Sequence, residues 1–431
     1  MRIVPIIACC CVFGLLACEG EVGDAAMTGT PDTGTHESLL PDAAMPLSDA
    51  GTLSDSGTPT TGVDSGTDAG PSPVDAGDAG EHVDPNDDAA IDAGPPSDGG
   101  PIVSEGPAEV RFVGRVDRSD ASSARFAWSG TGVVARFIGT SVAVDLGGGQ
   151  EYTVLIDGVL RPKLVPANGD TLIADDLSAD AHLIELYRRT EANQGESQFR
   201  GFTFANGGEL LPPTLAPSRR IEVIGDSITC GYGNEGADET CPFTPQTENH
   251  YQTYAAIAAR ALDAELSTIA WSGRGMVCNY GDDANSCSMP LPSFYDRTLP
   301  DHGDSQWDFS ASQPQAVIIN LGTNDYSTDS DPSEGQFTGA YTDFLMHVRS
   351  KYPNALILCT CGPLLWGEEL DMVRMFIENA VDATGDDNID TFELEPQNAM
   401  DGLGRGWHPS ITTHEHMADV LIEQLESRLG W

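Results

Sequence analysis

The sequence predicts two folded domains of different class. An all-β sandwich of jelly-roll type is expected over residues 106–216, and an α/β domain with a parallel sheet over residues 217–431. Apolar and polar residues alternate with a period of two in the first part, as in half-buried strands. Strand-like and helix-like stretches alternate in the second part, which implies a parallel sheet covered by helices on both faces. Three prolines between 212 and 217 mark the boundary.

Residues 1–18 are expected to be an export signal. Arg2 is the only charged residue there, and the apolar run from Ile3 to Leu16 is too short to span a membrane. The end of this segment, Leu-Leu-Ala-Cys with Cys18 last, resembles a bacterial lipobox, in which the cysteine is lipidated. The alternative is an ordinary signal peptide cut nearby. The lipobox interpretation predicts an exported, membrane-anchored lipoprotein at the cell surface or in the periplasm.

Residues 19–105 are expected to form a disordered acidic linker. This segment has 19 Asp and Glu residues and no Lys or Arg, and it is rich in Asp, Ala, Gly and Pro. Such a composition offers too little apolar surface to offset the entropy of ordering the chain. The whole chain has a net charge of −46, which argues against binding to nucleic acid.

The strands of the first domain follow from its alternating apolar residues. Such runs are centred on Ala135, Val144 and Val154, and further strands are expected near 183–187 and 199–204. Asp157-Gly158 directly follows the third run and is a strong hairpin signal. No helical pattern interrupts these strands.

The second domain begins with a strand at 221–224. Further strands are expected at 265–270, 315–320, 355–361 and 388–393, and helices near 251–262, 337–351 and 370–384. Met417, Leu421 and Leu425 fall on one face of a last helix, which Thr412 and Glu415 are expected to cap. Ligands of such sheets bind at the carboxyl ends of the strands.

Four residues stand at or beside those strand ends. Ser227 follows the first strand in Gly-Asp-Ser-Ile-Thr, and Gly273 follows the second in Ser-Gly-Arg-Gly. Asn324 follows the third in Gly-Thr-Asn-Asp, and His408 precedes the last helix in Trp-His-Pro. Taken singly, a helix cap, a loop glycine, an Asx turn and a surface or core histidine explain them. All four in order, each at a strand end or in a loop beside it, are a strong joint signal for a functional site at this edge of the sheet.

These four blocks resemble the SGNH (GDSL) hydrolase superfamily. Phe126-Ala-Trp-Ser-Gly-Thr-Gly and the Trp-His-Pro-Ser block also look like carbohydrate esterase family 2. The resemblance covers residues 107–431 and implies a three-layer, flavodoxin-like catalytic domain that needs no metal or organic cofactor. It implies Ser227 as nucleophile, His408 as base, and Gly273 and Asn324 in the oxyanion hole. The implied activity is deacetylation of plant-wall polysaccharide such as acetyl xylan or acetylated glucomannan.

One departure from the superfamily concerns the acid that orients the histidine. The superfamily has Asp three residues before the histidine, where this chain has Arg405, and many relatives have Asp where it has Gly406. Asp401 is one possible partner for His408, and a main-chain carbonyl is the second. Two further functions also stay open: a lipase or thioesterase of the same fold, and a non-catalytic carbohydrate-binding protein.

Two further groups of residues have open roles. The folded part has six cysteines, among which Cys230 with Cys241 and Cys278 with Cys287 are close enough in sequence to be suspected disulfide pairs. Three tryptophans near the motifs are candidates for a sugar-binding platform or for core packing: Trp271, Trp366 and Trp407.

Overall fold

The computed structural model describes residues 108–149, 151–167, 169–205, 207–282, 286–328 and 331–431. The expected export signal at 1–18, its Cys18 and the linker at 19–105 lie outside these ranges and remain predictions. Within them, no helix combines the length and apolar character required to cross a membrane.

The first folded part consists of two antiparallel sheets. One has the order β1 (Arg111–Val113), β3 (Gly132–Ile138), β8 (Ala181–Arg188), β5 (Tyr152–Ile156), β6 (Val159–Leu160), and β10 (Glu209–Leu211) also pairs with β3. The other has the order β2 (Ala124–Phe126), β9 (Ser197–Phe204), β4 (Val142–Gly148), β7 (Asp170–Ala174). The predicted antiparallel β domain is therefore confirmed, while its jelly-roll connectivity stays a prediction.

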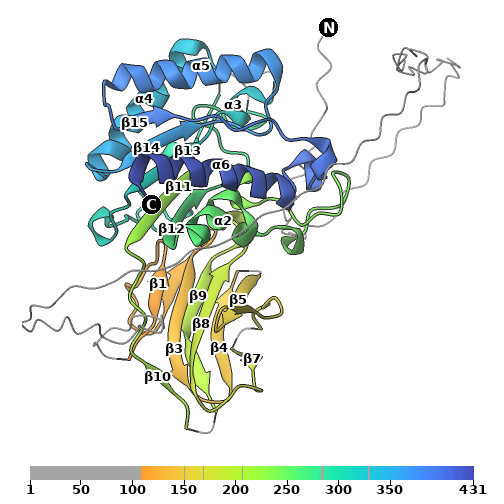
Figure 1. The fold of residues 1–431 in the computed structure, drawn as a ribbon, viewed down its shortest axis with the longest axis vertical. Coiled ribbons are helices and arrows are strands. Elements are labelled where there is room, and N and C mark those ends of the chain that lie inside the picture. Colours follow the sequence, from red (N-terminus) through yellow and green to blue (C-terminus); the bar gives the residue numbers. More distant parts are fainter. Residues whose placement is uncertain (1–107, 150, 168, 206, 283–285, 329–330) are drawn as a thin grey trace, which may run out of the picture. The chain divides into compact units, whose positions relative to one another are not determined.

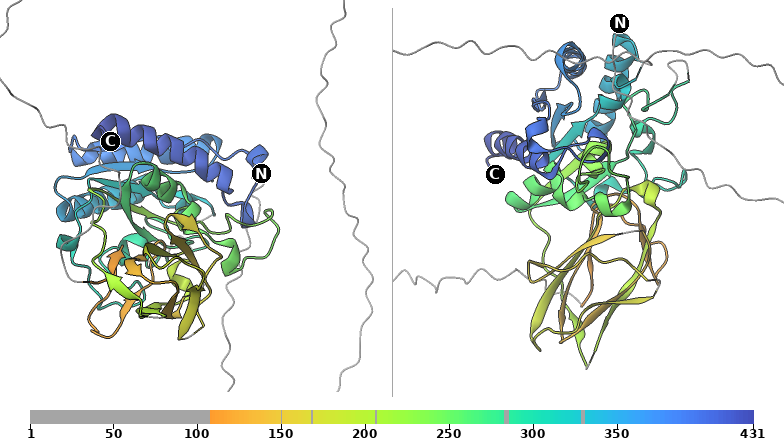
Figure 2. Two further views of the ribbon diagram at one scale, coloured as in Figure 1. Left: turned by 60° about the horizontal axis from the view of Figure 1, so that its bottom comes forward. Right: turned by 90° about the vertical axis from the view of Figure 1, so that its right-hand side faces the viewer.

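The two sheets share one apolar core. Val133 and Ile184 come from the first sheet and Val144 and Phe199 from the second, and all four are buried in the same cluster. The sheets accordingly face each other in Figure 2. The hairpin expected at Asp157-Gly158 joins β5 to β6, with positive φ angles of 53° and 73°, as a two-residue type I′ turn requires.

The second folded part contains a five-stranded parallel sheet. Its order is β12 (Ala264–Ala270), β11 (Arg219–Gly225), β13 (Ala316–Asn320), β14 (Leu356–Thr360), β15 (Ile389–Thr391). Numbered from β11, this is the order 2-1-3-4-5 of flavodoxin-like folds. All five expected strands are present. The direction of winding reverses between β11 and β13, so the carboxyl ends of these two strands border the crevice where such folds bind ligands.

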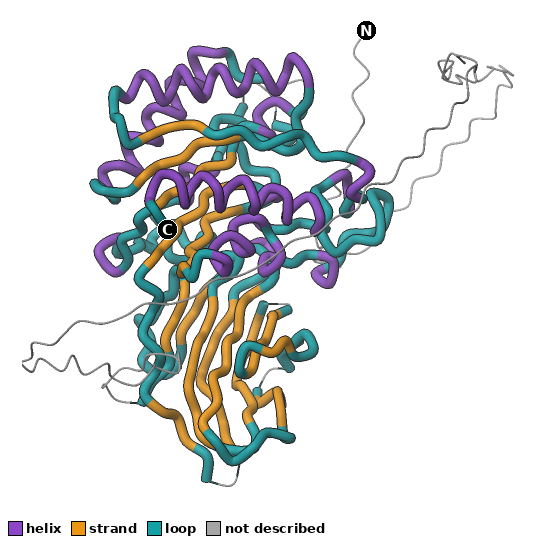
Figure 3. The backbone as a smooth tube through the Cα atoms, viewed as in Figure 1, coloured by secondary structure: helices purple, strands orange, loops and turns teal. Residues whose placement is uncertain are grey.

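Helices cover both faces of this sheet. The helices α2 (Tyr254–Ala261) and α6 (Ile411–Leu429) pack on one face, and α4 (Glu334–Lys351) and α5 (Gly367–Thr384) on the other. Figure 1 shows these three layers, and Figure 3 shows that the long helices belong to the second part alone. Two one-turn helices follow strand ends: α1 (Ser227–Cys230) and α3 (Thr323–Tyr326). The short 3-10 helices are Ala192–Gln194, Pro245–Thr247, His250–Gln252, Leu291–Phe294, Phe309–Ala311, Ala399–Asp401 and Arg405–Trp407.

The last helix begins differently from the expectation. Its N-cap is Ser410, whose Oγ accepts a hydrogen bond from the amide of Thr413 at 3.2 Å. The capping box expected from Thr412 and Glu415 is therefore wrong, because Thr412 already lies inside the first turn and is exposed. The cap falls only two residues after His408, which fixes the end of the loop that carries this histidine.

A buried polar cluster joins the sandwich to the α/β part at the middle of β11. The Arg115 guanidinium is wholly buried and lies 3.3 Å from the Glu222 carboxylate. The hydroxyls of Tyr295 and Tyr352 donate to the same carboxylate at 2.8 Å and 2.9 Å. Because a buried charge is costly without partners, this cluster ties the two parts together.

Candidate active site

Ser227 is positioned by the turn that follows the central strand β11. The strand ends at Gly225, and Asp226 is the N-cap of α1, its Oδ1 accepting from the amide of Ile228 at 3.0 Å. Ser227 is thus the first residue of a one-turn helix at the carboxyl end of the sheet. Because Asp226 caps this helix, the Ser227 hydroxyl is not needed as the N-cap acceptor and is available for catalysis.

His408 meets Ser227 across the sheet edge. Its Nε2 lies 2.8 Å from the Ser227 Oγ, although the two residues are 181 positions apart. The Nδ1 lies 3.1 Å from the carbonyl oxygen of Gly406, which can only accept. Nδ1 therefore carries the proton and donates, which leaves Nε2 as the acceptor for the serine hydroxyl. This is the geometry of a nucleophile and its base.

The surroundings keep His408 neutral. The side chain is largely buried, and this burial lowers its pKa from 6.5 to about 4, against opposing hydrogen bonds from the backbone at Gly406 and Arg405. Tyr232 packs its ring against the imidazole with 4.6 Å between centroids and stacks on Phe243 on its other side. A neutral imidazole is the form that can accept a proton.

Of the two groups expected to orient His408, the structure has the main-chain carbonyl. Asp401 is turned toward the His416 imidazole instead, at 3.3 Å. Gly406 has a φ of 64°, in the left-handed region that glycine adopts readily. A side chain at 406 would strain the backbone that presents this carbonyl. The glycine that stands there in place of an acid therefore allows the backbone conformation in which the carbonyl accepts from His408.

Gly273 lies in a turn just after β12. Its φ is 78°, and no described atom lies within 4 Å of the position where a Cβ would stand. The residues on either side are held: the amide of Ser272 donates to Glu191 Oε2 at 2.7 Å, and the amide of Arg274 to the carbonyl of Trp271 at 3.2 Å. The Gly273 backbone is therefore fixed in place beside open space.

Asn324 stands in α3, at the carboxyl end of β13. Its Nδ2 donates to the Arg274 carbonyl at 2.9 Å and to Asp226 Oδ2 at 3.2 Å. The side chain thus links the Gly273 turn to the residue that precedes the nucleophile. Both hydrogens of the amide have acceptors here, so donating to an oxyanion requires that one of these bonds be exchanged.

Two buried acids surround these donors. Burial raises the pKa of Asp226 to about 7 and that of Asp325 to about 6, against hydrogen bonds from backbone amides. Asp325 accepts from the amides of Met276, Val277 and Cys278, which fixes the remainder of the loop after Gly273. Asp226 accepts from the Ile228 amide through Oδ1 and from the Asn324 amide through Oδ2, so both of its oxygens have donors.

Two of the three candidate platform residues remain on the surface. Trp366 and Trp407 are 50% and 42% exposed. Trp271 is 9% exposed and packs against Phe294 with 4.9 Å between ring centroids, so for this residue core packing accounts for its position. Trp366 follows β14 and Trp407 is adjacent to His408, so both belong to the edge of the sheet that carries Ser227.

Of the two suspected disulfides, one is present and one is not. Cys278 and Cys287 are bonded, in the loop that Asp325 holds. Cys230 and Cys241 are both free thiols, so this suspected pair is wrong. Cys230 is the last residue of α1 and is wholly buried, with its Sγ 3.9 Å from Glu191 Oε2, whereas Cys241 is partly exposed.

Within the described ranges there is no cluster of three or more His, Cys, Asp or Glu that could hold a metal.

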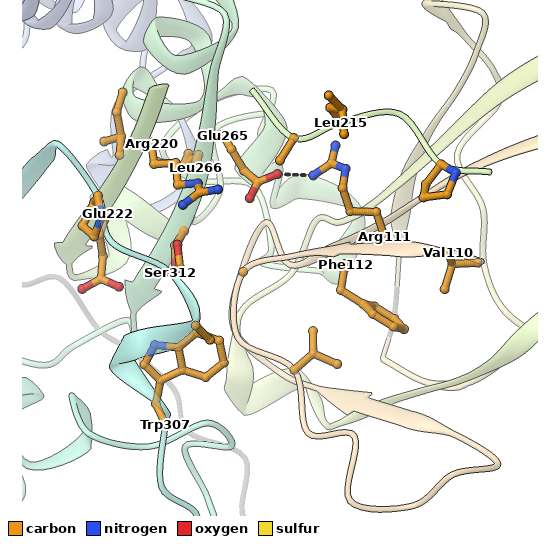
Figure 4. A pocket seen from close by; sticks show the side chains of 18 of the residues that line it. Val110, Arg111, Phe112, Leu215, Arg220, Glu222, Glu265, Leu266, Trp307 and Ser312 are labelled. Atoms are coloured by element: carbon orange, nitrogen blue, oxygen red, sulfur yellow. Dashed lines mark hydrogen bonds and ion pairs between the residues drawn. The ribbon is translucent and has the colours of Figure 1, made fainter. Parts of the chain in front are cut away.

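A separate cavity of about 540 Å³ lies at the other edge of the sheet. Figure 4 shows Arg111 and its ion-pair partner Glu265 on one side of this cavity and Trp307 on another. Its walls include Arg220 near the start of β11 and Glu222 in the middle of the strand, whereas Ser227 follows the end of that strand. The cavity therefore has no part in the arrangement around Ser227.

Comparisons with known proteins match both folded parts. A family model described as "Carbohydrate esterase 2 N-terminal" matches residues 112–213. A second, "GDSL-like Lipase/Acylhydrolase family", matches residues 223–416. Among curated proteins, the cellulase/esterase CelE of Acetivibrio thermocellus is 43% identical over 75% of this chain. The chain spans only 40% of the length of CelE. An acetylxylan esterase / glucomannan deacetylase of Cellvibrio japonicus is 27% identical over 75% of this chain and 89% of its own.

Solved structures agree with these matches. A family two carbohydrate esterase from Clostridium thermocellum, in complex with cellohexaose, is 40% identical with a TM-score of 0.71. The match covers 75% of this chain and all of that one. A family 2 enzyme from Corynascus thermopiles is 30% identical with a TM-score of 0.69, over 75% of this chain and all of that one.

Proposed function

This chain belongs to carbohydrate esterase family 2, and we propose that it removes acetyl groups from plant-wall polysaccharide through an acetyl-Ser227 intermediate. The observation that carries the proposal is the 2.8 Å contact between Ser227 Oγ and His408 Nε2, with Nδ1 bonded to the Gly406 carbonyl. This contact gives the serine a base in the correct tautomer, which acyl transfer requires.

The first half-reaction forms the acetyl enzyme. Ser227 Oγ attacks the acetyl carbonyl carbon while its proton passes to His408 Nε2, and the carbonyl π electrons move onto oxygen. The Gly273 amide and the Asn324 amide are the proposed donors to this oxyanion, together with the amide of Ser227. When the oxyanion collapses, the bond to the sugar oxygen breaks, and that oxygen takes the proton from His408.

The second half-reaction returns the enzyme to its starting state. Water gives a proton to His408 Nε2 as it attacks the acetyl carbonyl, and the second tetrahedral adduct expels Ser227 Oγ, which recovers the proton. The products are the free Ser227 hydroxyl and acetic acid, which loses its proton to the solvent and becomes acetate. The Gly406 carbonyl holds the imidazole in one tautomer throughout, and its dipole stabilises the imidazolium in place of the usual carboxylate.

The substrate class is supported by relatives and by exposed aromatic groups. The Cellvibrio relative is an acetylxylan esterase / glucomannan deacetylase, and the Clostridium structure contains cellohexaose. The half-exposed indoles of Trp366 and Trp407 offer flat apolar faces on the same edge of the sheet as Ser227. Such faces suit the apolar faces of pyranose rings, so we propose them as the sugar platform.

The test is acetate release from acetylated xylan and acetylated glucomannan by the full chain. We expect release by the wild type, and we expect Ser227→Ala and His408→Ala each to lower it by about 10⁴-fold or more. Acetate release that Ser227→Ala leaves unchanged would contradict the acetyl-serine intermediate. A folded wild type that binds these glycans but releases no acetate from them, or from a small acetyl ester, would favour a non-catalytic carbohydrate-binding protein.

We further propose that the chain is exported and anchored to a membrane by a lipid on Cys18, at the cell surface or in the periplasm. The support is the Leu-Leu-Ala-Cys sequence and the charge-poor apolar run before it. The acidic segment at 19–105 then acts as a tether between anchor and enzyme. Metabolic labelling with radioactive palmitate tests this, since labelling that persists after Cys18→Ala argues against the anchor.

A further inference from the structure

Glu191 is a buried carboxylate that the sandwich part extends toward the active site. It lies just after β8, at the N-cap of the 3-10 helix Ala192–Gln194, and it is wholly buried. Its Oε2 accepts from the amide of Ser272 at 2.7 Å and lies 3.9 Å from the Cys230 Sγ. Ser272 immediately precedes Gly273, and Cys230 ends the helix that begins with Ser227. One carboxylate oxygen therefore contacts both the residue before Gly273 and the last residue of the helix that Ser227 begins.

The burial of this acid is energetically unfavourable on its own. Burial raises the pKa of Glu191, while hydrogen bonds from Ser272 and the charge of Arg188 lower it. A second buried acid, Glu248, accepts from the Glu191 amide at 3.0 Å, and burial together with Glu191 raises its pKa well above the usual range. The charge of Arg188 lowers the pKa of both acids and so offsets part of the cost of burying them.

The Gly273 turn is held on either side of the glycine and at the Gly273 carbonyl, which accepts from the amide of Tyr280 at 2.9 Å. Glu191 holds the amide of Ser272 before it, and Asn324 holds the carbonyl of Arg274 after it at 2.9 Å. We propose that Glu191 is a positioning residue for the deacetylation reaction, by which the sandwich part fixes the Gly273 amide against Ser227. This inference rests on the proposed function, because it assigns a role within the same site.

The proposal predicts an effect on turnover rather than on substrate binding. An oxyanion donor must stand close to 3 Å from the oxygen that carries the developing charge, and a misplaced donor loses most of its effect. Without the carboxylate, the Ser272 amide has no acceptor. The turn is then held by the hydrogen bonds at the Gly273 carbonyl and at Arg274, which leave the residue before the glycine free to move. The Michaelis complex places little charge on the carbonyl oxygen, so its stability depends much less on this turn.

The experiment compares Glu191→Ala, Glu191→Gln and Glu222→Gln in the full chain, with 4-nitrophenyl acetate as substrate. Glutamine at 191 retains an oxygen that accepts from Ser272, whereas alanine does not. Glu222→Gln is the matched control, because Glu222 is also a buried acid joining the sandwich to the α/β part but lies in the middle of β11, away from the Gly273 turn. Inhibition by phenylboronic acid, which forms a tetrahedral anionic adduct with a serine, measures the oxyanion hole separately.

We expect Glu191→Ala to lower kcat by about 10- to 100-fold with KM changed less than about threefold, and to weaken the boronic acid by a similar factor. Glu191→Gln should recover most of both losses, and Glu222→Gln should lower the melting temperature without changing kcat. Equal losses of kcat in Glu191→Ala and Glu222→Gln, or a Glu191→Ala enzyme with unchanged kcat and boronic acid affinity, overturn the proposal. A wild type inactive on acetyl esters would instead refute the proposed function.

Discussion

At the scale of single residues, the main feature is a serine and histidine without a carboxylate partner. His408 donates to the Gly406 carbonyl, and Asp401 pairs with His416. The sequence showed that an acid was missing at 405 and 406 but could not decide between Asp401 and a carbonyl. That choice depends on backbone angles, in particular the positive φ of Gly406, which a sequence does not contain.

The low pKa of His408 predicts the acidic limb of the pH profile. Only the neutral imidazole accepts the serine proton, so kcat/KM should fall as pH decreases through about 4, rather than through the ordinary histidine value of 6.5. The same depressed pKa means that folded-state stability decreases as pH falls from 6.5 toward 4. Initial rates on 4-nitrophenyl acetate between pH 3.5 and 8 measure the limb, and a midpoint near 6.5 contradicts this account.

The position of Asp401 predicts that its carboxylate has little effect on catalysis. Because Asp401 pairs with the exposed His416, Asp401→Asn should leave kcat within about threefold of wild type. His416→Ala is the matched variant, since it removes the same ion pair from the other side. Steady-state kinetics of both variants provide the check. A decrease of 100-fold or more in Asp401→Asn alone would show that this acid reaches His408 during turnover.

At the scale of elements, strand ends were predictable and loop contacts were not. All five parallel strands lie where apolar runs placed them, so the positions of Ser227, Gly273 and Asn324 near one edge followed from the sheet. Tyr232 against His408 and Glu191 against Ser272 had no comparable signal. Such contacts join loops that are far apart in sequence, and neither periodicity nor spacing encodes them.

The N-cap of α6 predicts a difference between two neighbouring hydroxyls. Ser410→Ala removes the cap acceptor for Thr413 and should lower the free energy of unfolding by about 1 kcal/mol. Thr412→Ala is the control, because Thr412 is exposed within the helix, where alanine is the better helix former. Urea denaturation followed by circular dichroism measures both. Equal destabilisation by the two substitutions would be inconsistent with Ser410 as the cap.

At the scale of the whole molecule, the sandwich and the α/β part are joined by buried polar groups as well as by the chain. The cluster around Glu222 lies at the middle of β11, whereas Glu191 contacts Ser272 beyond the carboxyl end of β12. The proline cluster at 212–217 indicated where one fold ends, but a composition change cannot reveal which buried side chains cross that boundary. Neither buried acid stands in a motif that would single it out in the sequence.

The buried pair of Arg115 and Glu222 predicts a large effect on stability. Arg115→Met leaves the Glu222 carboxylate buried without its cation and should lower the free energy of unfolding by about 3–5 kcal/mol. Arg118→Met is the matched control, because Arg118 is exposed and lies over the Phe112 ring at 5.4 Å. Urea unfolding, followed through tryptophan fluorescence, measures both. A loss below about 1 kcal/mol in Arg115→Met would argue against this interface as a stabilising one.

The hydrogen bond between Glu191 of the sandwich and Ser272 of the α/β part has a consequence for the design of chimeric enzymes. A crossover at the proline cluster would pair the sandwich of one esterase with the catalytic part of another, and every strand would be intact. The acceptor for the Ser272 amide would nevertheless come from a foreign parent. In recombination libraries of this family, the segment around 191 and the segment around 272 should therefore be taken from the same parent. The two segments form one unit of recombination, although they are separate in the gene.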